Sequence, residues 1–458
     1  MTVIRPNSIS GVSSITAQGG SINVHRADGT AGDLTINNIV GAAATFSGVV
    51  SYEDVTNVDS VGVITARAGI NVTGGVITGN LTGTASTSTN AATAYAIDSA
   101  ASLNTSGIVT ATTFNYTGSQ NLSNRNIIIN GAMEVAQRGT SSTVSGYGSV
   151  DRYTVTYSGL NEAPTQSQVD VASGTTPYSL GFRKAFKITN GNQTSGADAN
   201  DYISFSTRIE AQDMSSCGWN YTSTSSYITL SFWIKSSVAQ SFHGYIDVLD
   251  GTRHIYPFET GALTADTWTK ITKVIPGNSN LQFDNDATNG KELGLMFIMW
   301  PMLGTNYTDN SVSFNSWIPY VSAARFPDVT TTWYTTNDST LEYTGIQLEV
   351  GPVATPFEHR SYADELRRCQ RYYEIVGGAV RAFDYSNYIG VGAPFKVTKR
   401  AIPTNTMVHD GLISGASFQT FITSGMTDEI QLEGCYPQWS SARGGYVYGF
   451  KITSDAEL

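Results

Sequence analysis

The chain has 458 residues, a formal net charge of −11 and a charged fraction of only 14%, well below the ~25% of an average soluble protein. Gly and Tyr are abundant, with 45 and 24 residues, which is typical of short β-strands joined by tight turns. The first lysine is Lys184, so no basic patch indicates a nucleic-acid-binding protein. We also find no apolar run of the ~20 residues that cross a bilayer and no signal-peptide pattern at the start. We therefore expect no nucleic-acid partner, no membrane insertion and synthesis in the cytoplasm.

Cysteines and catalytic motifs give no sign of a metal site or an active site. Cys217, Cys369 and Cys435 are far apart and form no C-x-x-C pair, which argues against a disulfide framework and a zinc site. Three free thiols agree with a reducing compartment. The sequence contains no G-x-S-x-G, H-E-x-x-H or P-loop motif. We expect no catalytic residues, no metal and no cofactor, and we predict that the protein is not an enzyme.

Residues 1–123 differ in composition from the rest, because they contain no Lys, Trp or Cys. Such a segment buries too little apolar area to fold alone at ~25 cal/mol per Å². A unit of Gly, two β-branched residues and Ser or Thr recurs at 48–51, 62–65, 75–78 and 107–110. Units of this size become stable by stacking on neighbours or on other chains, so we predict a homotrimeric shaft. A flexible linker is the alternative.

From residue 124 the composition becomes that of a globular domain, and all seven tryptophans lie in this part of the chain. Period-two alternation predicts strands at 227–235, 267–275 and 345–350. The continuous apolar run 293–300 predicts a strand that is buried on both faces. Strands at this spacing, without helices between them, favour a mainly β fold with a β-sandwich (jelly-roll) body at 124–360.

One short helix is predicted at 361–375. Ser361 is its expected N-cap, with Asp364 three residues later and Glu365 in the first turn. The helical period predicts an apolar face made of Tyr362, Leu366, Cys369 and Tyr373. Three arginines lie off that face and form either a solvated surface with local ion pairs or an anion site: Arg367, Arg368 and Arg371.

Residues 376–458 are again rich in β-formers, Tyr and Gly, and predict a small β-rich C-terminal knob. Aromatic rings stack on the apolar faces of sugars, and those of the knob lie in Gly/Ser-rich surroundings. Five of them are the candidate glycan-binding residues: Tyr388, Tyr436, Trp439, Tyr446 and Tyr448. The alternative is that they fill the core of the knob. By contrast, Trp233, Trp268 and Trp300 lie in apolar strands and are expected in the core of the body.

Two passages resemble a known family. The first is NRNIIINGAMEVAQRG at 124–139, followed by VDRY at 150–153, and the second is TGIQLEVG at 344–351, followed by ATPFEHR at 354–360 and CQRYY at 369–373. In this order they resemble the opening and closing strands of the jelly-roll domain in many phage tail fibre and minor virion structural proteins. Residues 58–67 and 79–85 are similar to the shafts of fibre proteins from phages of marine cyanobacteria.

The resemblance implies a fold related to carbohydrate-binding modules, a trimeric assembly and a place in the virion. Residues 399–404 are similar to a strand that often follows the helix in this family. We therefore expect a phage tail fibre, a homotrimeric virion protein for host attachment that binds cell-surface polysaccharide. Its N-terminal segment would contact other tail or virion proteins. The alternatives are a purely structural fibre on capsid or baseplate, and a polysaccharide depolymerase, because glycosidases need only two suitably spaced carboxylates.

Two local patterns have plainer explanations. Residues 284–290 are similar to a calcium loop, but the EF-hand pattern needs its Gly one place earlier and a Glu where Leu295 stands. The pair Asn289-Gly290 is better explained as a turn, and a calcium ion on the jelly roll stays an alternative. The pair His409 and Asp410 is expected to lie on the surface rather than in a catalytic triad.

Overall fold

The computed structural model describes residues 24–26, 28–33, 124–283, 293–381, 388–409, 412–424 and 426–457. The chain divides into two compact units, Met1–Ser106 and Gly107–Leu458. In the first unit the described residues form a turn, closed by a bridge between His25 and Ala31 and an Arg26–Asp33 ion pair of 2.7 Å. The repeats of the predicted shaft and the calcium-loop candidate at 284–290 lie outside the described residues. The predicted domain boundaries stay a prediction.

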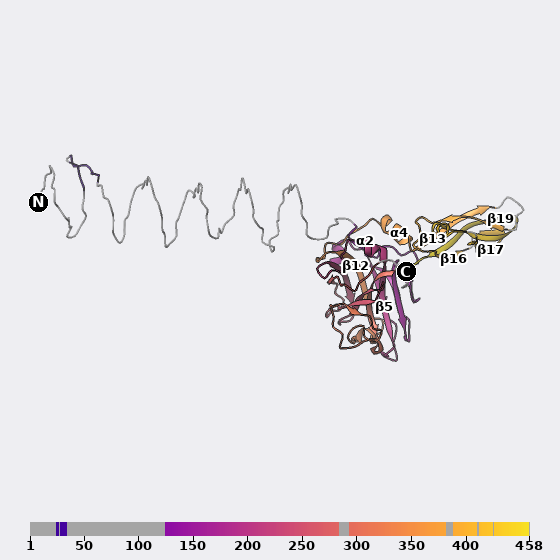
Figure 1. Ribbon diagram of the computed structural model, residues 1–458, viewed down its shortest axis with the longest axis horizontal. Helices are drawn as coiled ribbons and strands as arrows, with labels where there is room; N and C mark the ends of the chain where they lie inside the picture. The colour runs from indigo at the N-terminus through magenta and orange to yellow at the C-terminus, as the bar shows by residue number, and fades with distance from the viewer. Residues whose placement is uncertain are drawn as a thin grey trace. The chain divides into compact units, whose positions relative to one another are not determined.

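The body of the second unit is a sandwich of two six-stranded antiparallel sheets, which confirms the predicted β-sandwich (Figure 1). The first sheet consists, in spatial order, of β1 (Ser141–Ser142), β3 (Thr165–Asp170), β4 (Lys184–Thr189), β12 (Thr340–Val350), β6 (Tyr227–Ser236) and β9 (Thr269–Pro276). The second consists of β11 (Ile318–Pro319), β8 (His254–Glu259), β7 (His243–Val248), β10 (Leu293–Leu303), β5 (Tyr202–Glu210) and β2 (Tyr153–Ser158). Strands β6, β9 and β12 are those that alternation predicted.

The core of the body is a stack of aromatic rings between the two sheets. Phe205 of β5 stacks on Tyr343 of β12 with 4.3 Å between ring centroids, and on Tyr153 of β2 at 5.3 Å. Phe232 of β6 meets Phe297 of β10 at 5.3 Å. All five rings are buried, and truncating one such ring to Ala typically lowers stability by about 3–5 kcal/mol. These contacts hold the two sheets face to face.

Strand β10 is buried on both faces, as predicted. Leu295, Phe297 and Met299 face the inter-sheet core. Met296 and Trp300 belong to a second cluster on the other side of the sheet, beneath the connection at 304–329. That connection supplies the buried Phe326 and several half-buried rings. The outer face of this sheet is therefore covered by chain.

Short helical turns join some strands, where we expected none. They are α1 (Thr176–Ser179), α2 (Ala211–Ser216), the 3-10 helix η2 (Thr305–Tyr307) and α3 (Thr332–Thr335). Each is six residues or fewer, and periodicity cannot detect elements of one or two turns. Among the described residues, no helix is long and apolar enough to cross a bilayer.

Helix α4 (Tyr362–Gln370) begins where predicted but ends before the predicted residue 375, and Tyr373 lies in the following strand instead. On the predicted apolar face, Cys369 and Tyr373 are buried as expected, and Tyr362 is not. Ser361 caps it, because its Oγ accepts a hydrogen bond of 3.2 Å from the Asp364 backbone N–H. Tyr362 is 57% exposed, whereas Glu365 and Cys369 are buried. Glu365 replaces the expected aromatic ring because it has partners inside the protein, the Arg360 guanidinium and the Asn130 backbone N–H.

The C-terminal domain is β-rich, as predicted, and is built around one long strand. Strand β19 (Pro437–Asp455) pairs with β13 (Tyr373–Arg381), β14 (Tyr388–Gly390), β16 (Thr404–His409) and β17 (Leu412–Phe421). A two-stranded ladder of β15 (Ala393–Pro394) and β18 (Gly434–Cys435) and the helix α5 (Asp428–Glu433) complete it. The strand expected at 399–404 is absent, since β16 begins at Thr404. Lys399 is instead buried in an ion pair with Glu374 at 2.8 Å.

Ion pairs and stacked arginines connect this domain to the body. Arg371 donates two 2.9 Å hydrogen bonds to Glu210, so this arginine makes an ion pair rather than a solvated face. Arg152, buried at the start of β2, stacks over Tyr372 at 3.4 Å and pairs with Glu457. The backbone N–H of Ala456 donates to Tyr372 at 2.7 Å. The segment that follows β19 is therefore anchored to the body.

Candidate functional site

The two passages that carry the family resemblance lie side by side, and a buried amide links them. Asn126 donates through Nδ2 to the Ile346 carbonyl at 3.0 Å. Its Oδ1 accepts from the backbone N–H of Ile128 at 3.0 Å and of Leu348 at 3.1 Å. A Cβ on Gly131 would lie 2.1 Å from the Ile346 carbonyl oxygen, so only glycine fits there. The first segment is thus hydrogen-bonded along β12.

Arg360 forms the centre of a second network beside this contact. Its guanidinium donates to Glu365 at 2.9 Å, to Glu358 at 3.0 Å and to the Asn126 carbonyl. Glu358 in turn accepts from the Asn126 backbone N–H at 2.8 Å. Charge-assisted bonds of this kind hold side chains in one geometry. Both of these carboxylates are therefore committed to structural contacts.

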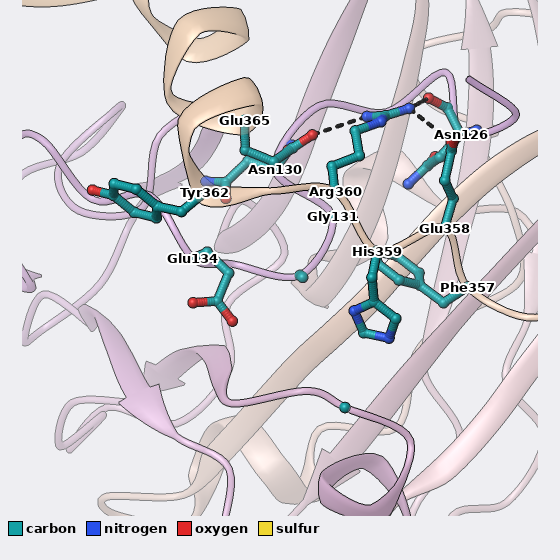
Figure 2. Close-up of a pocket in the computed structure, with 12 residues that line it drawn as sticks. Asn126, Asn130, Gly131, Glu134, Phe357, Glu358, His359, Arg360, Tyr362 and Glu365 are labelled. Carbon is teal, nitrogen blue, oxygen red and sulfur yellow. Dashed lines mark hydrogen bonds and ion pairs between the residues drawn. The ribbon is translucent and has the colours of Figure 1, made fainter. Parts of the chain in front are cut away.

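A pocket of about 260 Å³ opens next to the network (Figure 2). The figure shows Glu134 between Tyr362 and His359, apart from the dashed contacts of Arg360. Asn130 and Glu365 line its inner side, and Phe357 also borders it. One side of the pocket is thus formed by hydrogen-bonded residues, Asn130 and Glu365. The other lining side chains come from the segment with Glu134, the segment with Phe357 and His359, and the first turn of α4 with Tyr362.

Glu134 is the unpaired carboxylate of this pocket. It makes no ion pair and no side-chain hydrogen bond with any described residue, and it is half-buried. Burial raises the pKa of its carboxyl, and the positive charges of Lys184 and Arg183 oppose this rise. When it is ionised, a carboxylate without a protein partner accepts strong hydrogen bonds from the hydroxyl groups of a ligand.

His359 and Tyr362 supply the aromatic surfaces. The His359 Nε2 lies 2.9 Å from the Leu180 carbonyl oxygen, which can only accept, so Nε2 carries the proton. Its ring packs against Phe182 at 5.1 Å and Phe357 at 4.9 Å. The imidazole is therefore held in place, whereas the exposed phenol of Tyr362 offers an open ring face at the rim.

The aromatic surface continues from the pocket onto the outer face of the first sheet. Phe357 and Phe182 join a cluster with the half-buried Trp233 and Trp268. These two indoles pack against the cluster but are not enclosed, which differs from the core position that we predicted for them. Trp300, the third tryptophan of that prediction, is buried as expected.

Three of the five glycan-binding residues that we predicted in the knob have described side chains, and these three differ in exposure. Trp439 is 0% exposed and lies between Phe418 at 6.0 Å and Phe450 at 5.2 Å. It belongs to the small core, so its assignment to a sugar site was wrong: an indole near the start of β19 that faces this core has no access to solvent. Tyr448 is 44% exposed and Tyr436 is half-buried.

Tyr388 and Tyr446 lie on β14 and β19, and their side chains are outside the described residues. The same holds for the predicted surface pair of His409 and Asp410. In the part of the chain that the structure describes, no group of three His, Cys, Asp or Glu residues is placed to hold a metal ion.

The pocket residues were present in the motifs but were not recognised as a site. Glu134 lies in the first motif passage, and Phe357 and His359 lie in the second. Residues 124–139 and 354–365 are more than 200 positions apart, and only the fold brings them together. The helical period assigned Tyr362 to the buried face, so its exposure was not foreseen.

No family model and no curated protein matches this chain. Among solved structures, it is similar to the enzymatically active domain of bacteriophage CBA120 tailspike protein 4, with 10% identity over 49% of this chain and 21% of that chain, at a TM-score of 0.26. It is also similar to the carbohydrate-binding module TmCBM61 in complex with β-1,4-galactotriose, with 9% identity over 49% of this chain and 97% of that one, at 0.24. The family 11 carbohydrate-binding module of Clostridium thermocellum, in complex with a mixed-linked tetrasaccharide, has 12% identity over 47% and 98%, at 0.21. TM-scores of this size do not establish a shared fold or a shared ligand.

Proposed function

We propose that the β-sandwich body binds a neutral sugar unit in the pocket between 124–139 and 354–365. The observation that carries this proposal is that the pocket contains both carboxylates in ion pairs and a carboxylate without one. Glu358 and Glu365 are held by Arg360, while the Glu134 carboxylate and the Tyr362 ring have no such partner. A ring face and a carboxylate are what a sugar needs, since its C–H face stacks and its hydroxyls donate.

The size of the pocket limits the ligand. Sites for drug-sized molecules measure about 300–1,000 Å³, and this pocket is about 260 Å³. It therefore fits one sugar ring, and the neighbouring aromatic surface with Trp233 and Trp268 offers room for the rest of a chain. A single-ring site is weak by itself. Several copies on one assembly gain avidity without any new contact.

On the scale of the particle, we place the chain in the fibre of a phage virion, where such sites would attach the particle to polysaccharide on the host surface. The motif passages at 124–139 and 344–373 support this placement. Binding is favoured over hydrolysis, because a glycosidase needs two functional carboxylates. In this pocket the other two carboxylates, those of Glu358 and Glu365, form ion pairs with Arg360.

Calorimetric titration of the full-length protein with neutral mono- and oligosaccharides tests the pocket. We expect Tyr362→Ala and Glu134→Gln to weaken binding by about tenfold or more, equal to about 1.4 kcal/mol. Tyr448→Ala is the comparison variant for Tyr362→Ala, since it removes an exposed phenol from the other candidate location, the C-terminal knob. Glu429→Gln, on the exposed side of α5, is the control for Glu134.

The two tyrosine variants separate the pocket from the knob. If Tyr448→Ala abolishes binding and Tyr362→Ala does not, the site lies in the C-terminal domain. If the parent protein binds none of the sugars, the alternative of a purely structural fibre is favoured.

A further inference from the structure

The outer face of the second sheet carries an arginine–aromatic cluster that the pocket does not use. The connection at 304–329 crosses this face and packs Tyr307, Phe314 and Tyr320 against Trp300 and its neighbours. Arg325 lies in the same connection, and its backbone N–H donates to the Tyr307 carbonyl at 3.2 Å. Its guanidinium lies 5.0 Å from the ring centroids of Trp300 and Tyr307 and 5.6 Å from that of Tyr320.

Arg325 has no anionic partner among the described residues. Within the part of the chain that the structure describes, no carboxylate forms an ion pair with it, and its only side-chain hydrogen bond is a long one of 3.4 Å to the Ser322 Oγ. Its Nε is buried without a partner, and so is the Nε1 of the neighbouring Trp300. Two donors at one place are thus unsatisfied, although most buried donors in proteins find an acceptor.

Arg253 shows what a matched arginine looks like in the same cluster. It donates to the two oxygens of Asp247 at 2.9 and 2.6 Å and stacks over Tyr320 at 3.5 Å. Asp247 is fully buried, and burial raises the pKa of its carboxyl even though Arg253 and Arg325 oppose the rise. Asp247 is therefore paired with Arg253, and the positive charge of Arg325 has no such carboxylate among the described residues.

The acidic side chains of the covering connection do not neutralise that charge. Asp309 accepts from the Ser311 backbone N–H at 2.8 Å. Asp328 accepts from Thr308 and, at 2.9 Å, from the amide of Asn310. Both carboxylates are used to shape the connection, and neither pairs with Arg325.

We propose that this cluster, formed by Arg325, Trp300, Tyr307 and Tyr320, binds an acidic sugar, meaning a sugar ring that carries a carboxylate or a sulfate ester. A guanidinium fork binds such groups with two parallel hydrogen bonds, and the half-buried tyrosines offer ring surface for stacking. The local charge matters because the whole chain carries −11 and would otherwise repel a polyanion. The inference shares the ligand class of the proposed function but does not depend on its pocket.

Binding of the full-length protein to immobilised polygalacturonate, dextran sulfate and neutral dextran tests this site. We expect retention on at least one of the two anionic polymers, and this retention should weaken as NaCl rises from about 0.05 to 0.5 M. Any retention on neutral dextran should not depend on Arg325. Arg325→Gln should weaken the anionic retention about tenfold. Lys270→Gln, which removes one exposed positive charge from β9 on the other sheet, should change it less than about twofold.

Further measurements distinguish a carboxylate ligand from a sulfate ester, and the Arg325 cluster from the Glu134 pocket. Retention on polygalacturonate assigns a carboxylate ligand, and retention on dextran sulfate alone assigns a sulfate ester. Arg325→Lys keeps the charge but loses the fork, so it should fold and bind more weakly than the parent. Glu134→Gln should leave the anionic retention unchanged, whatever it does to neutral sugars. No retention of the parent, retention insensitive to salt, or a folded Arg325→Gln variant that binds like the parent would overturn the inference.

Discussion

The Asp151 carboxylate is completely buried, and its hydrogen bonds inside the protein do not fully compensate for the hydration that it loses on folding. It accepts hydrogen bonds from the Gln137 backbone N–H at 2.9 Å and from the Gln137 side chain at 2.5 Å, and Arg138 lies 3.9 Å away. Burial raises its pKa from 3.8 to about 6, although Gln137 and Arg138 oppose the rise. Folding therefore makes this group a weaker acid.

The raised pKa of Asp151 predicts a loss of stability as pH rises. Between pH 3.8 and about 6 the folded protein keeps a proton that the unfolded chain releases, so the contribution is favourable below this window and is lost through it. We expect the unfolding free energy of Asp151→Asn, relative to the parent, to increase by up to about 3 kcal/mol from acidic to neutral pH. Urea titrations across that range measure it. Asp170→Asn, at an exposed site, is the control, and equal pH profiles for Asp151→Asn and parent would contradict the prediction.

At the scale of single elements, the segment after β19 and the start of α4 are each held by a few polar contacts. In the first of these, Glu457 lies 3.3 Å from Arg138 and the Ala456 backbone N–H donates to the Tyr372 carbonyl. Glu457 pairs with Arg152, which is 1% exposed and also donates to the Arg208 carbonyl at 2.6 Å. Removing one partner of a buried pair leaves an uncompensated charge, which is much worse than removing both.

We expect Glu457→Gln to lower the unfolding free energy by about 3–5 kcal/mol, because Arg152 loses its counter-charge inside the protein. The double variant Arg152→Met/Glu457→Gln should lose less than the sum of the two single variants. Chemical denaturation measures all three, with Glu429→Gln as the exposed control. Additive losses would show that the two side chains are not coupled.

Removing the N-cap of α4 should affect both stability and binding. Ser361→Ala removes the side-chain acceptor of the Asp364 backbone N–H, which then keeps only the Ser361 carbonyl oxygen at 3.1 Å. Losing an N-cap of this kind typically lowers stability by about 1 kcal/mol. Because Tyr362 is the next residue, we also expect weaker binding of neutral sugars by the pocket. Ser361→Thr keeps the acceptor and is the matched control. A binding constant unchanged in Ser361→Ala would mean that the first turn of α4 does not position Tyr362.

At the scale of the whole molecule, the number of assembled chains sets how many sugar sites act together. We predict a homotrimer through residues 1–123, so light scattering of the full-length protein should give a mass near three times 49.0 kDa. Deleting 1–123 should give a monomer that keeps its affinity for free sugar but is retained less on a surface coated with glycan, since avidity is lost. A monomeric full-length chain would favour the linker alternative.

The regular strands of the fold could be predicted from sequence, but the site could not. Alternation identified β6 and β12, and the unbroken apolar run identified β10, because these patterns are local. The buried position of Glu365 depends on Asn130 and Arg360, and the first of these is 235 residues away in sequence. The inward position of Trp439 depends on which side of β19 faces the small core that includes Phe418 and Phe450, and composition near the chain end says nothing about this.

The covering of β10 by the connection at 304–329 has a consequence for related sequences. Met296, Ile298 and Trp300 are tolerated on an outer sheet face only because that connection shields them; uncovered, they would form an exposed apolar patch prone to association. A relative in which this connection is shortened to a tight turn should therefore carry polar residues at the three equivalent positions. Loop length and the alternation of β10 should change together across evolution, and a relative with a short loop and an unbroken apolar strand would be expected to bury that face against another chain.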